Sequence, residues 1–273
     1  MSRIPQNLQA VHERITTAAQ AVARDPNEVG LLAVSKTFGP DAVLEAAQAG
    51  QTAFGENYVQ EALDKMATVR AARPDLLLAW HFIGPIQSNK TRPIAEHFDW
   101  VHSIEREKIA QRLSAQRPAH LPPLNVCLQI NISGEASKSG VAPQDAALIA
   151  HAIAALPHLR LRGLMAVPEP ADEYEMQRAP FRQLRALLED LRAQGLAVDT
   201  LSMGMSADMA AAIAEGATIV RVGSAIFGNR DYAKGIENQL YRRRQYGDRA
   251  DRRLGRKTHR RRHHPRGRSQ CRG

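Results

Sequence analysis

Leu31-Leu32-Ala33-Val34-Ser35-Lys36 is the stretch from which the fold of this chain can be worked out. The run is short and aliphatic and Gly39-Pro40 follows it, so it predicts a buried strand over residues 31–36. Lys36 ends this strand, where a lysine can lose its solvation and its proton and attack a carbonyl carbon. The alternative is an ordinary lysine that ends a strand and points into water. The rest of the chain has to decide between the two.

Segments with strand character and segments with helical character alternate along the chain. An amphipathic helix is expected first, over residues 5–24, because apolar residues recur there at helical spacing. The predicted strands cover residues 31–36, 53–57, 77–83, 100–104, 125–132, 159–167, 200–203 and 219–227. The predicted helices between them cover residues 40–49, 58–73, 89–97, 105–116, 143–155, 174–194 and 207–215.

This alternation implies parallel strands that are joined by crossover helices. Eight repeats favour a closed (β/α)8 barrel over an open doubly wound sheet. We therefore expect an α/β protein in which residues 1–233 form a single TIM barrel that begins with a helix.

The last forty residues have a different composition. Residues 234–273 hold thirteen Arg and two Lys against three acidic residues, a net charge of +12. Subtracting this from the +9 of the whole chain leaves −3 for residues 1–233. Few apolar residues and dense Arg predict a disordered basic tail. Such a tail could attach to nucleic acid or to an anionic surface, but its scarcity of interleaved aromatic residues favours a solvated extension.

Composition argues against several classes of protein. No run of roughly 18 apolar residues occurs, so no membrane span is expected, and residues 1–10 lack a secretory signal pattern. The chain has two cysteines, and Cys127 lies within an apolar run, which fits a reducing cytoplasm. Neither CxxC nor HExxH is present, so the sequence predicts no metal site.

The C-terminal ends of the predicted strands carry mostly polar residues or glycine. In a (β/α)8 barrel the active site lies at these ends. Strand ends that belong to no site are also often polar, so the pattern is suggestive only. The residues concerned are Lys36, Asn57, His81, Ser103, Asn131, Met165, Ser202, Met203 and Arg221.

Two glycine-containing segments at these ends are typical of phosphate binding. Gly204-Met205-Ser206 follows the seventh predicted strand, and Gly223-Ser224 lies near the end of the eighth. Loops in these positions often hold a phosphate with backbone N–H groups and hydroxyls. Ser206 could instead cap the helix over residues 207–215, or do both. Phosphate loops together with a strand-end lysine favour pyridoxal 5′-phosphate (PLP), held as a Schiff base.

Arg221 lies in the middle of the apolar segment 219–223. If it points outward, it is an ordinary surface charge. If it points inward, it could face the pyridine nitrogen of PLP and, because arginine stays protonated, keep that nitrogen unprotonated. The ring would then be a weaker electron sink, which favours restrained chemistry.

Several longer motifs occur along the chain, each at a predicted strand end. They are Leu32-Ala33-Val34-Ser35-Lys36-Thr37, Phe54-Gly55-Glu56-Asn57-Tyr58-Val59-Gln60-Glu61, Trp80-His81-Phe82-Ile83-Gly84-Pro85-Ile86-Gln87-Ser88-Asn89-Lys90, Gln129-Ile130-Asn131 through Lys138-Ser139-Gly140, Leu161-Arg162-Gly163-Leu164-Met165, Ser202-Met203-Gly204-Met205-Ser206 and Arg221-Val222-Gly223-Ser224-Ala225-Ile226-Phe227-Gly228. Over residues 5–233 the chain therefore resembles the pyridoxal phosphate homeostasis protein family.

The resemblance implies a single (β/α)8 barrel similar to the N-terminal barrel of alanine racemase, with PLP as cofactor. It implies these positions: the Schiff-base lysine at Lys36, the phosphate loops at Ser206, Gly223 and Ser224, the arginine facing the pyridine nitrogen at Arg221, and Asn57, His81 and Met203 around the ring. The chain departs from the family pattern at Phe38, at Ser224, where threonine is more usual, and in its basic tail.

These observations leave three hypotheses about the function of the protein. The family has no firmly established enzymatic activity, and the resemblance implies a carrier or buffer of PLP in vitamin B6 homeostasis, which could pass PLP to apo-enzymes. A cytoplasmic location is expected from the cysteine usage, and a monomer is the default because a second domain is lacking. The alternative is a weak amino-acid racemase. Racemisation needs a base on each face of the ring, and the second base of the alanine racemase type comes from a further domain, for which the expected ordered part leaves no room. The third is a nucleic-acid binder that uses residues 234–273.

Overall fold

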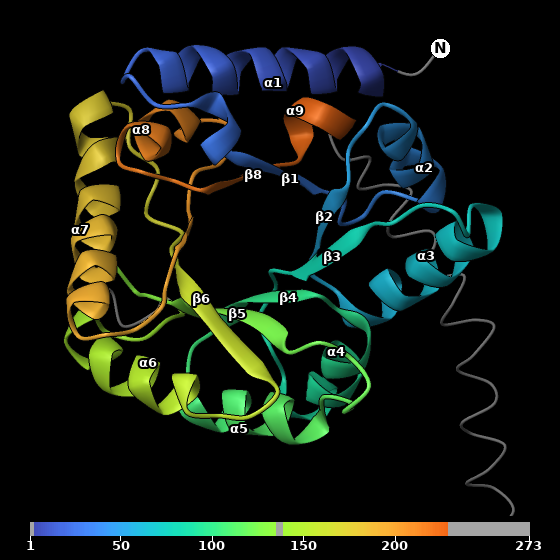
Figure 1. Cartoon of the computed structure of the whole chain (residues 1–273). Helices are drawn as coiled ribbons and strands as arrows, with labels where there is room; N and C mark the ends of the chain where they lie inside the picture. Colours follow the sequence, from blue (N-terminus) through green and yellow to red (C-terminus); the bar gives the residue numbers. More distant parts are fainter. Residues whose placement is uncertain (1–2, 135–138, 229–273) are drawn as a thin grey trace, which may run out of the picture. The chain divides into compact units, whose positions relative to one another are not determined.

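Eight parallel strands pair in sequence order and close into a barrel, as the sequence predicts (Figure 1). The computed structural model of the chain describes residues 3–134 and 139–228. The predicted tail, residues 234–273, lies outside the described residues. The strands are β1 (Gly30–Val34), β2 (Ala53–Glu56), β3 (Ala79–Phe82), β4 (Trp100–Ile104), β5 (Leu124–Gln129), β6 (Leu159–Met165), β7 (Thr200–Ser202) and β8 (Ile219–Val222).

Helices surround the barrel and alternate with its strands (Figure 1). They are α2 (Pro40–Gln48), α3 (Val59–Ala72), α4 (Thr91–His97), α5 (Glu107–Gln116), α6 (Ala146–Ala154), α7 (Tyr174–Ala193), α8 (Met209–Ala214) and the short α9 (Ser224–Phe227). Short 3-10 turns are found at η1 (Pro26–Glu28), η2 (Ser88–Lys90) and η3 (Pro143–Asp145). No helix in the described part of the chain is long and apolar enough to cross a membrane.

The first helix, α1 (Ile4–Gln20), completes the ring beside α8 and α9 (Figure 1). Its apolar residues recur every three or four positions and are buried. Two of its polar side chains bind loops at the far end of the sequence. Asn7 Nδ2 donates to the Ile226 carbonyl at 2.8 Å, and Arg14 donates to the Ser206 carbonyl at 2.8 Å. The helix thus fixes the segments that follow β7 and β8.

Side chains along β1 alternate between the two faces of the barrel wall. Leu31 and Ala33 belong to the core between strands and helices. Leu32 lies against Gly55 of β2, and Val34 against Gly223. Because successive side chains of a strand point to opposite faces, Leu32 and Val34 face the barrel axis. Ser35, the next residue, faces outward, where its hydroxyl and carbonyl contact Glu56 and Lys65.

The eighth predicted strand, residues 219–227, was too long. β8 ends at Val222, and α9 follows from Ser224. An apolar run is compatible with a strand or a buried helix, and here the two lie in succession. The predicted cap at Ser206 is also wrong, because α8 begins at Met209 with Asp208 as its N-cap residue. Lys36 lies two residues beyond β1, in a turn, rather than within the strand.

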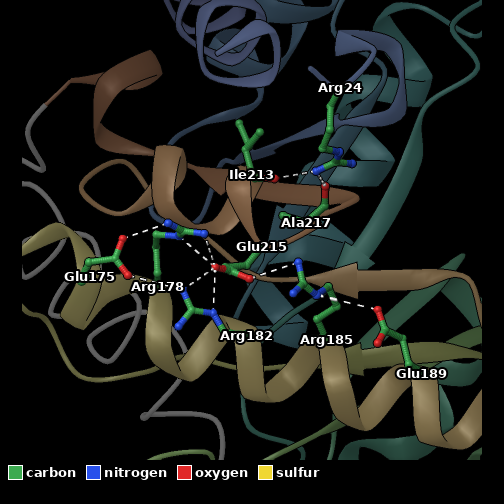
Figure 2. A network of polar contacts seen from close by, with 9 residues as sticks. All are labelled: Arg24, Glu175, Arg178, Arg182, Arg185, Glu189, Ile213, Glu215 and Ala217. Atoms are coloured by element: carbon green, nitrogen blue, oxygen red, sulfur yellow. Dashed lines mark hydrogen bonds and ion pairs between the residues drawn. The ribbon is translucent and has the colours of Figure 1, made fainter. Parts of the chain in front are cut away.

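A charged cluster fixes α8 to α7 on the outside of the barrel (Figure 2). Glu215, directly after α8, has a fully buried side chain. Three arginines of α7 converge on it: Arg178 at 2.7 Å, Arg182 at 3.1 Å and Arg185 at 3.1 Å. They are spaced four and three residues apart, so they lie on one helix face. The Glu215 cluster, as we call these four residues, anchors the helix that follows the β7 loop.

Candidate active site

Lys36 occupies a tight turn at the C-terminal end of β1. The Phe38 N–H donates to the Ser35 carbonyl at 3.1 Å, which closes the turn. Thr37 has a φ of 71°, a left-handed conformation that is uncommon for a β-branched residue. Its hydroxyl donates to the Lys36 carbonyl at 2.5 Å. Strained backbone of this kind persists only where surrounding contacts hold it.

A buried ion pair holds the backbone on the N-terminal side of Lys36. Lys65 of α3 donates to Glu56 Oε1 at 2.6 Å and to the Ser35 carbonyl at 2.8 Å. The Ser35 hydroxyl donates to the same Glu56 oxygen at 2.6 Å. Burial raises the pKa of Glu56, and the charge of Lys65 opposes that shift. The sequence interpretation missed Lys65, although it lies on the apolar face of α3 with Ala62, Met66 and Val69.

A second carboxylate, that of Glu61, holds the backbone on the C-terminal side of Lys36. Glu61 Oε1 accepts from the Thr37 N–H at 2.7 Å and from Lys65 Nζ at 3.2 Å. Lys65 therefore uses its three N–H donors on Glu56, Glu61 and the Ser35 carbonyl. Glu61 lies in the first turn of α3, where acidic side chains are favoured. It also fixes Thr37, the strained residue after Lys36.

The interior of the barrel contains a hydrogen-bonded chain of polar side chains. His81 Nδ1 lies 2.9 Å from His102 Nε2, and His102 Nδ1 lies 2.7 Å from Ser202 Oγ. Arg221 donates to Ser202 Oγ at 2.8 Å. These residues come from β3, β4, β7 and β8, and β4 and β7 are not neighbours in the barrel. Side chains from non-adjacent strands can meet only across the interior. The chain of residues is called the interior relay below.

Arg221 points inward, which decides between the two orientations that its sequence left open. It is 6% exposed. Besides the Ser202 hydroxyl it donates to the Ser202 carbonyl at 2.6 Å and to the Ala166 carbonyl at 3.0 Å. All three acceptors are neutral oxygens. Burial lowers the pKa of Arg221 to about 10, although Asp208 favours its charge.

Both histidines of the interior relay are buried, which disfavours their charged forms. Burial lowers the pKa of His81 to about 3, and burial also lowers the pKa of His102, with smaller contributions from His81 and Arg221. The His81 ring stacks on Trp100 with the ring centres 5.3 Å apart, and Arg162 covers Trp100 at 4.8 Å. The sequence interpretation placed His81 and Arg221 at strand ends but gave no role to His102, which lies inside its strand.

Asn57, directly after β2, brings a polar atom to the same end of the barrel. Its Oδ1 is buried and has no hydrogen-bond partner among the described residues. Gly84, after β3, packs on the Asn57 backbone so closely that a Cβ there would overlap the Asn57 carbonyl. Leaving a buried amide oxygen without a hydrogen-bond donor is unfavourable, so a donor from a ligand or a water molecule would stabilise this position.

The two glycine-containing loops follow β7 and β8. Gly204 has a φ of 95°, and a Cβ there would lie 2.6 Å from Ala212 of α8, so the loop requires glycine. The Met205 N–H donates to Asp208 Oδ1 at 2.6 Å, and Ser206 is half-buried. Ser224 begins α9 and is exposed. Met203 is fully buried and belongs to the hydrophobic core.

The predicted residues thus fall into separate groups at one end of the barrel. Val34, two residues before Lys36, contacts Gly223, so the ends of β1 and β8 are adjacent. The interior relay joins His81 to Arg221 through Ser202 and His102. Ser206 is held through its carbonyl by Arg14 of α1.

Comparison with known proteins identifies the chain's relatives. The family model "alanine racemase, N-terminal domain" matches residues 6–231. The pyridoxal phosphate homeostasis protein of Pseudomonas aeruginosa is 65% identical over 232 residues, which is 85% of this chain and 98% of the relative. The protein of that name from Escherichia coli K12 is 54% identical over 234 residues, 86% of this chain and 100% of the relative.

A solved structure agrees with these matches. The PipY protein of Synechococcus elongatus PCC7942, solved with PLP bound, is 37% identical to this chain with a TM-score of 0.67, and the match covers 78% of this chain and 100% of PipY. Identity at this level over nearly whole chains establishes common ancestry as well as a common fold. The chain therefore belongs to the alanine racemase N-terminal domain family, and within it to the pyridoxal phosphate homeostasis proteins.

Proposed function

We propose that this protein binds PLP at the C-terminal end of its barrel, holds it as a Schiff base on Lys36, and acts as a carrier in vitamin B6 homeostasis. The observation that carries the proposal is the buried guanidinium of Arg221, whose three hydrogen bonds end on neutral oxygens. A buried charge without a charged partner is unfavourable. An anionic ligand with a basic ring nitrogen removes that penalty.

A buried arginine with carbonyl acceptors is not by itself a binding site, as Arg117 illustrates. Arg117 also donates to carbonyls, at Ala95, Phe98 and Pro122. Ala95 and Phe98 lie at the C-terminal end of α4, where the helix dipole supplies negative potential. The acceptors of Arg221 follow β6 and end β7, where no helix ends. Its charge is therefore less compensated.

Two further features fit PLP. The unpartnered Asn57 oxygen is available to accept from a polar group of a ligand. The loops at Gly204-Met205-Ser206 and Gly223-Ser224 have the composition that phosphate requires, with glycine, hydroxyls and backbone N–H groups. The residues that we expect to hold PLP are Lys36, Asn57, His81, Met203, Ser206, Arg221, Gly223 and Ser224. The relatives named for PLP homeostasis, and PipY with PLP bound, support the choice of ligand.

The residues around Lys36 favour reversible holding of the cofactor. When bound, PLP supplies an aldehyde that condenses with an amine. The buried contacts of Lys65, Glu56 and Glu61 fix the turn on which the Lys36 amine is presented. Arg221 stays protonated and so withholds a proton from the ring nitrogen, which limits carbanion chemistry. Release to an apo-enzyme then needs an amine that displaces Lys36.

An absorbance titration with PLP tests the proposal. We expect wild-type protein to develop a visible band, and Lys36→Ala to lose or shift it. Lys90→Ala, which removes an exposed lysine near the end of β3, is the matched control and should keep the band. Borohydride reduction followed by peptide mass mapping should place the adduct on Lys36. A band that survives Lys36→Ala, or a wild type that PLP does not colour, would overturn the proposal.

A chiral assay then separates carrier from racemase. We expect wild-type protein loaded with PLP to reactivate an apo-enzyme that uses PLP and to leave L-alanine without detectable conversion to D-alanine. Conversion that disappears in Lys36→Ala would favour the racemase.

A further inference from the structure

We propose that Arg221, acting through Ser202 and His102, fixes His81 as a neutral imidazole that carries its proton on Nε2. In this form His81 can donate a hydrogen bond but cannot take up a proton from a ligand. Ser202 and His102 are then positioning residues. The tautomer assignment stands without any ligand, and only its consequence for PLP chemistry rests on the proposed function.

Arg221 determines which group donates and which accepts in each hydrogen bond of the interior relay. Arginine can only donate, so Ser202 Oγ accepts from Arg221 at 2.8 Å. The single proton of the Ser202 hydroxyl is then free to be donated to His102 Nδ1 at 2.7 Å. His102 therefore accepts at Nδ1 and carries its own proton on Nε2, since a neutral imidazole has one donor and one acceptor.

The same reasoning continues to His81. His102 Nε2 donates to His81 Nδ1 across 2.9 Å, so His81 carries its proton on Nε2. That nitrogen lies on the side of the ring away from His102. The only lone pair of His81 that could accept a proton is thus occupied by the N–H of His102.

The opposite direction leaves a proton without an acceptor. If His102 donated from Nδ1 to Ser202 Oγ, that oxygen would accept from both His102 and Arg221. Its own proton would then need a second acceptor, and the described residues supply none. A buried donor left unpaired costs about 1–3 kcal/mol. The arrangement led by Arg221 instead pairs the Ser202 hydroxyl and the His102 N–H, and its one remaining donor, the outer N–H of His81, is not among the buried unpartnered atoms of the described residues.

Charging either histidine is disfavoured by its surroundings. The groups that act on His102 are His81 and the cation of Arg221, and the Trp100 ring beside His81 is itself covered by the cation of Arg162. Both rings are buried. An imidazolium here would add a positive charge to a region that already holds Arg221.

The inference bears on the carrier and racemase alternatives. A racemase needs a proton acceptor on each face of the ring, and a histidine beside the ring is a natural candidate. A His81 locked with its proton on Nε2 is excluded from that role while remaining a hydrogen-bond donor. The interior relay thus favours a site that holds PLP over one that moves protons on it.

Nitrogen-15 NMR of the full-length protein labelled at histidine tests the proposal directly, without added PLP. Long-range proton–nitrogen spectra distinguish the two tautomers and the imidazolium, and His81→Gln and His102→Gln assign the signals. We expect both rings to carry the proton on Nε2. A proton on Nδ1 of either ring, or an imidazolium at neutral pH, would overturn the proposal.

Ser202→Ala provides the second measurement. Without the hydroxyl, Nδ1 of His102 loses its donor, and we expect the tautomer signals of His102 and of His81, which His102 orients, to become mixtures while the signals of the other histidines are kept. Ser202→Thr, which retains a hydroxyl, should restore the wild-type pattern. Ser103→Ala is the matched control, because Ser103 is adjacent to His102 in sequence but donates to the Gly84 carbonyl. A His102 signal that is unchanged in Ser202→Ala would contradict the relay.

The titration of the labelled protein with PLP separates this inference from the proposed function. We expect the His81 signal to shift while its proton stays on Nε2. Conversion to an imidazolium or to the Nδ1 form on binding would overturn the inference even where the visible band appears. A protein that PLP does not colour, but whose histidines have the assigned tautomers, would overturn only the proposed function.

Discussion

Glu215 and Arg221 are both buried charges, but they are partnered in opposite ways. Glu215 is surrounded by three arginines at 2.7 to 3.1 Å, on the outside of the barrel (Figure 2). Arg221 is surrounded by one hydroxyl and two carbonyls, inside the barrel. The first charge is paired directly with opposite charges, whereas the second makes hydrogen bonds only to neutral oxygens, with Asp208 acting on it without a hydrogen bond.

Under the proposed function, this difference separates a structural charge, Glu215, from a charge that binds a ligand, Arg221. Removing a fully paired buried charge leaves its partners unpaired and destabilises the fold. Removing a charge that has only neutral partners also removes a desolvation penalty, so the cost to stability is smaller. The two sites should therefore respond in opposite ways when stability and PLP binding are measured on the same variants.

The largest effect on stability is expected for Glu215→Gln. We expect it to lower the free energy of unfolding by about 3–5 kcal/mol, because three arginines lose their shared carboxylate. Urea unfolding measures this, and the visible band with PLP should be kept in the folded fraction. Glu175→Gln is the control from the same region: Glu175 pairs with Arg178 and Arg182 but is 66% exposed, so its loss should lower the free energy of unfolding far less than the loss of Glu215. Equal losses for the two variants would contradict the comparison.

Acid should destabilise the protein through the interior relay. Unfolded histidine binds a proton near pH 6.5, whereas the folded state resists it, and the pKa of His81 is lowered to about 3. The unfolded state therefore binds more protons as the pH falls from about 6.5 toward 3, and each buried histidine lowers stability by about 1.4 kcal/mol per pH unit in that window. Above about pH 6.5 this contribution is constant.

Urea unfolding at several pH values measures that slope. We expect His102→Gln to have a shallower dependence on pH than the wild type, because one buried histidine is gone. His151→Gln is the control, since His151 lies exposed on α6. A wild-type stability that stays level between pH 6.5 and 4.5 would show that the interior imidazoles take up protons easily.

The smallest effect on stability, with the largest effect on binding, is expected for Arg221→Met. Losing three hydrogen bonds is partly offset by losing a buried charge, so we expect a change within about 2 kcal/mol. Its affinity for PLP, followed by the visible band, should fall at least about tenfold, the factor that corresponds to 1.4 kcal/mol. Arg117→Met should keep the band. A large loss of stability with unaltered PLP affinity would place Arg221 with Glu215 among the structural charges.

The barrel itself could be predicted from the sequence because its signal repeats. Each strand is short and apolar, each helix is amphipathic, and eight copies in order leave few topologies. The errors of the prediction lie at the ends of helices and strands. The apolar segment 219–227 has no polar residue at the boundary between β8 and α9, so nothing in its composition divides it.

The sequence pointed to Lys36, Asn57, His81 and Arg221 because they lie at or near the ends of predicted strands, and their part in binding stays a prediction. Lys65 was missed because it reaches the turn from a helix, through contacts that no spacing rule describes. Ser202 and His102 were missed as partners because β4 and β7 are about 100 residues apart, and only closure of the barrel brings them within 2.7 Å.

The contacts of α1 have a consequence for how the protein is made. Asn7 binds the carbonyl of Ile226, 219 positions later, and Arg14 binds that of Ser206. During synthesis the first helix emerges long before most of its partners, and only α2 and η1 can cover part of its apolar face until α8 and α9 are made. The loops after β7 and β8 can take their final form only then. A chain truncated before residue 226 would therefore contain the Lys36 turn but lack a contact that fixes the segment after β8.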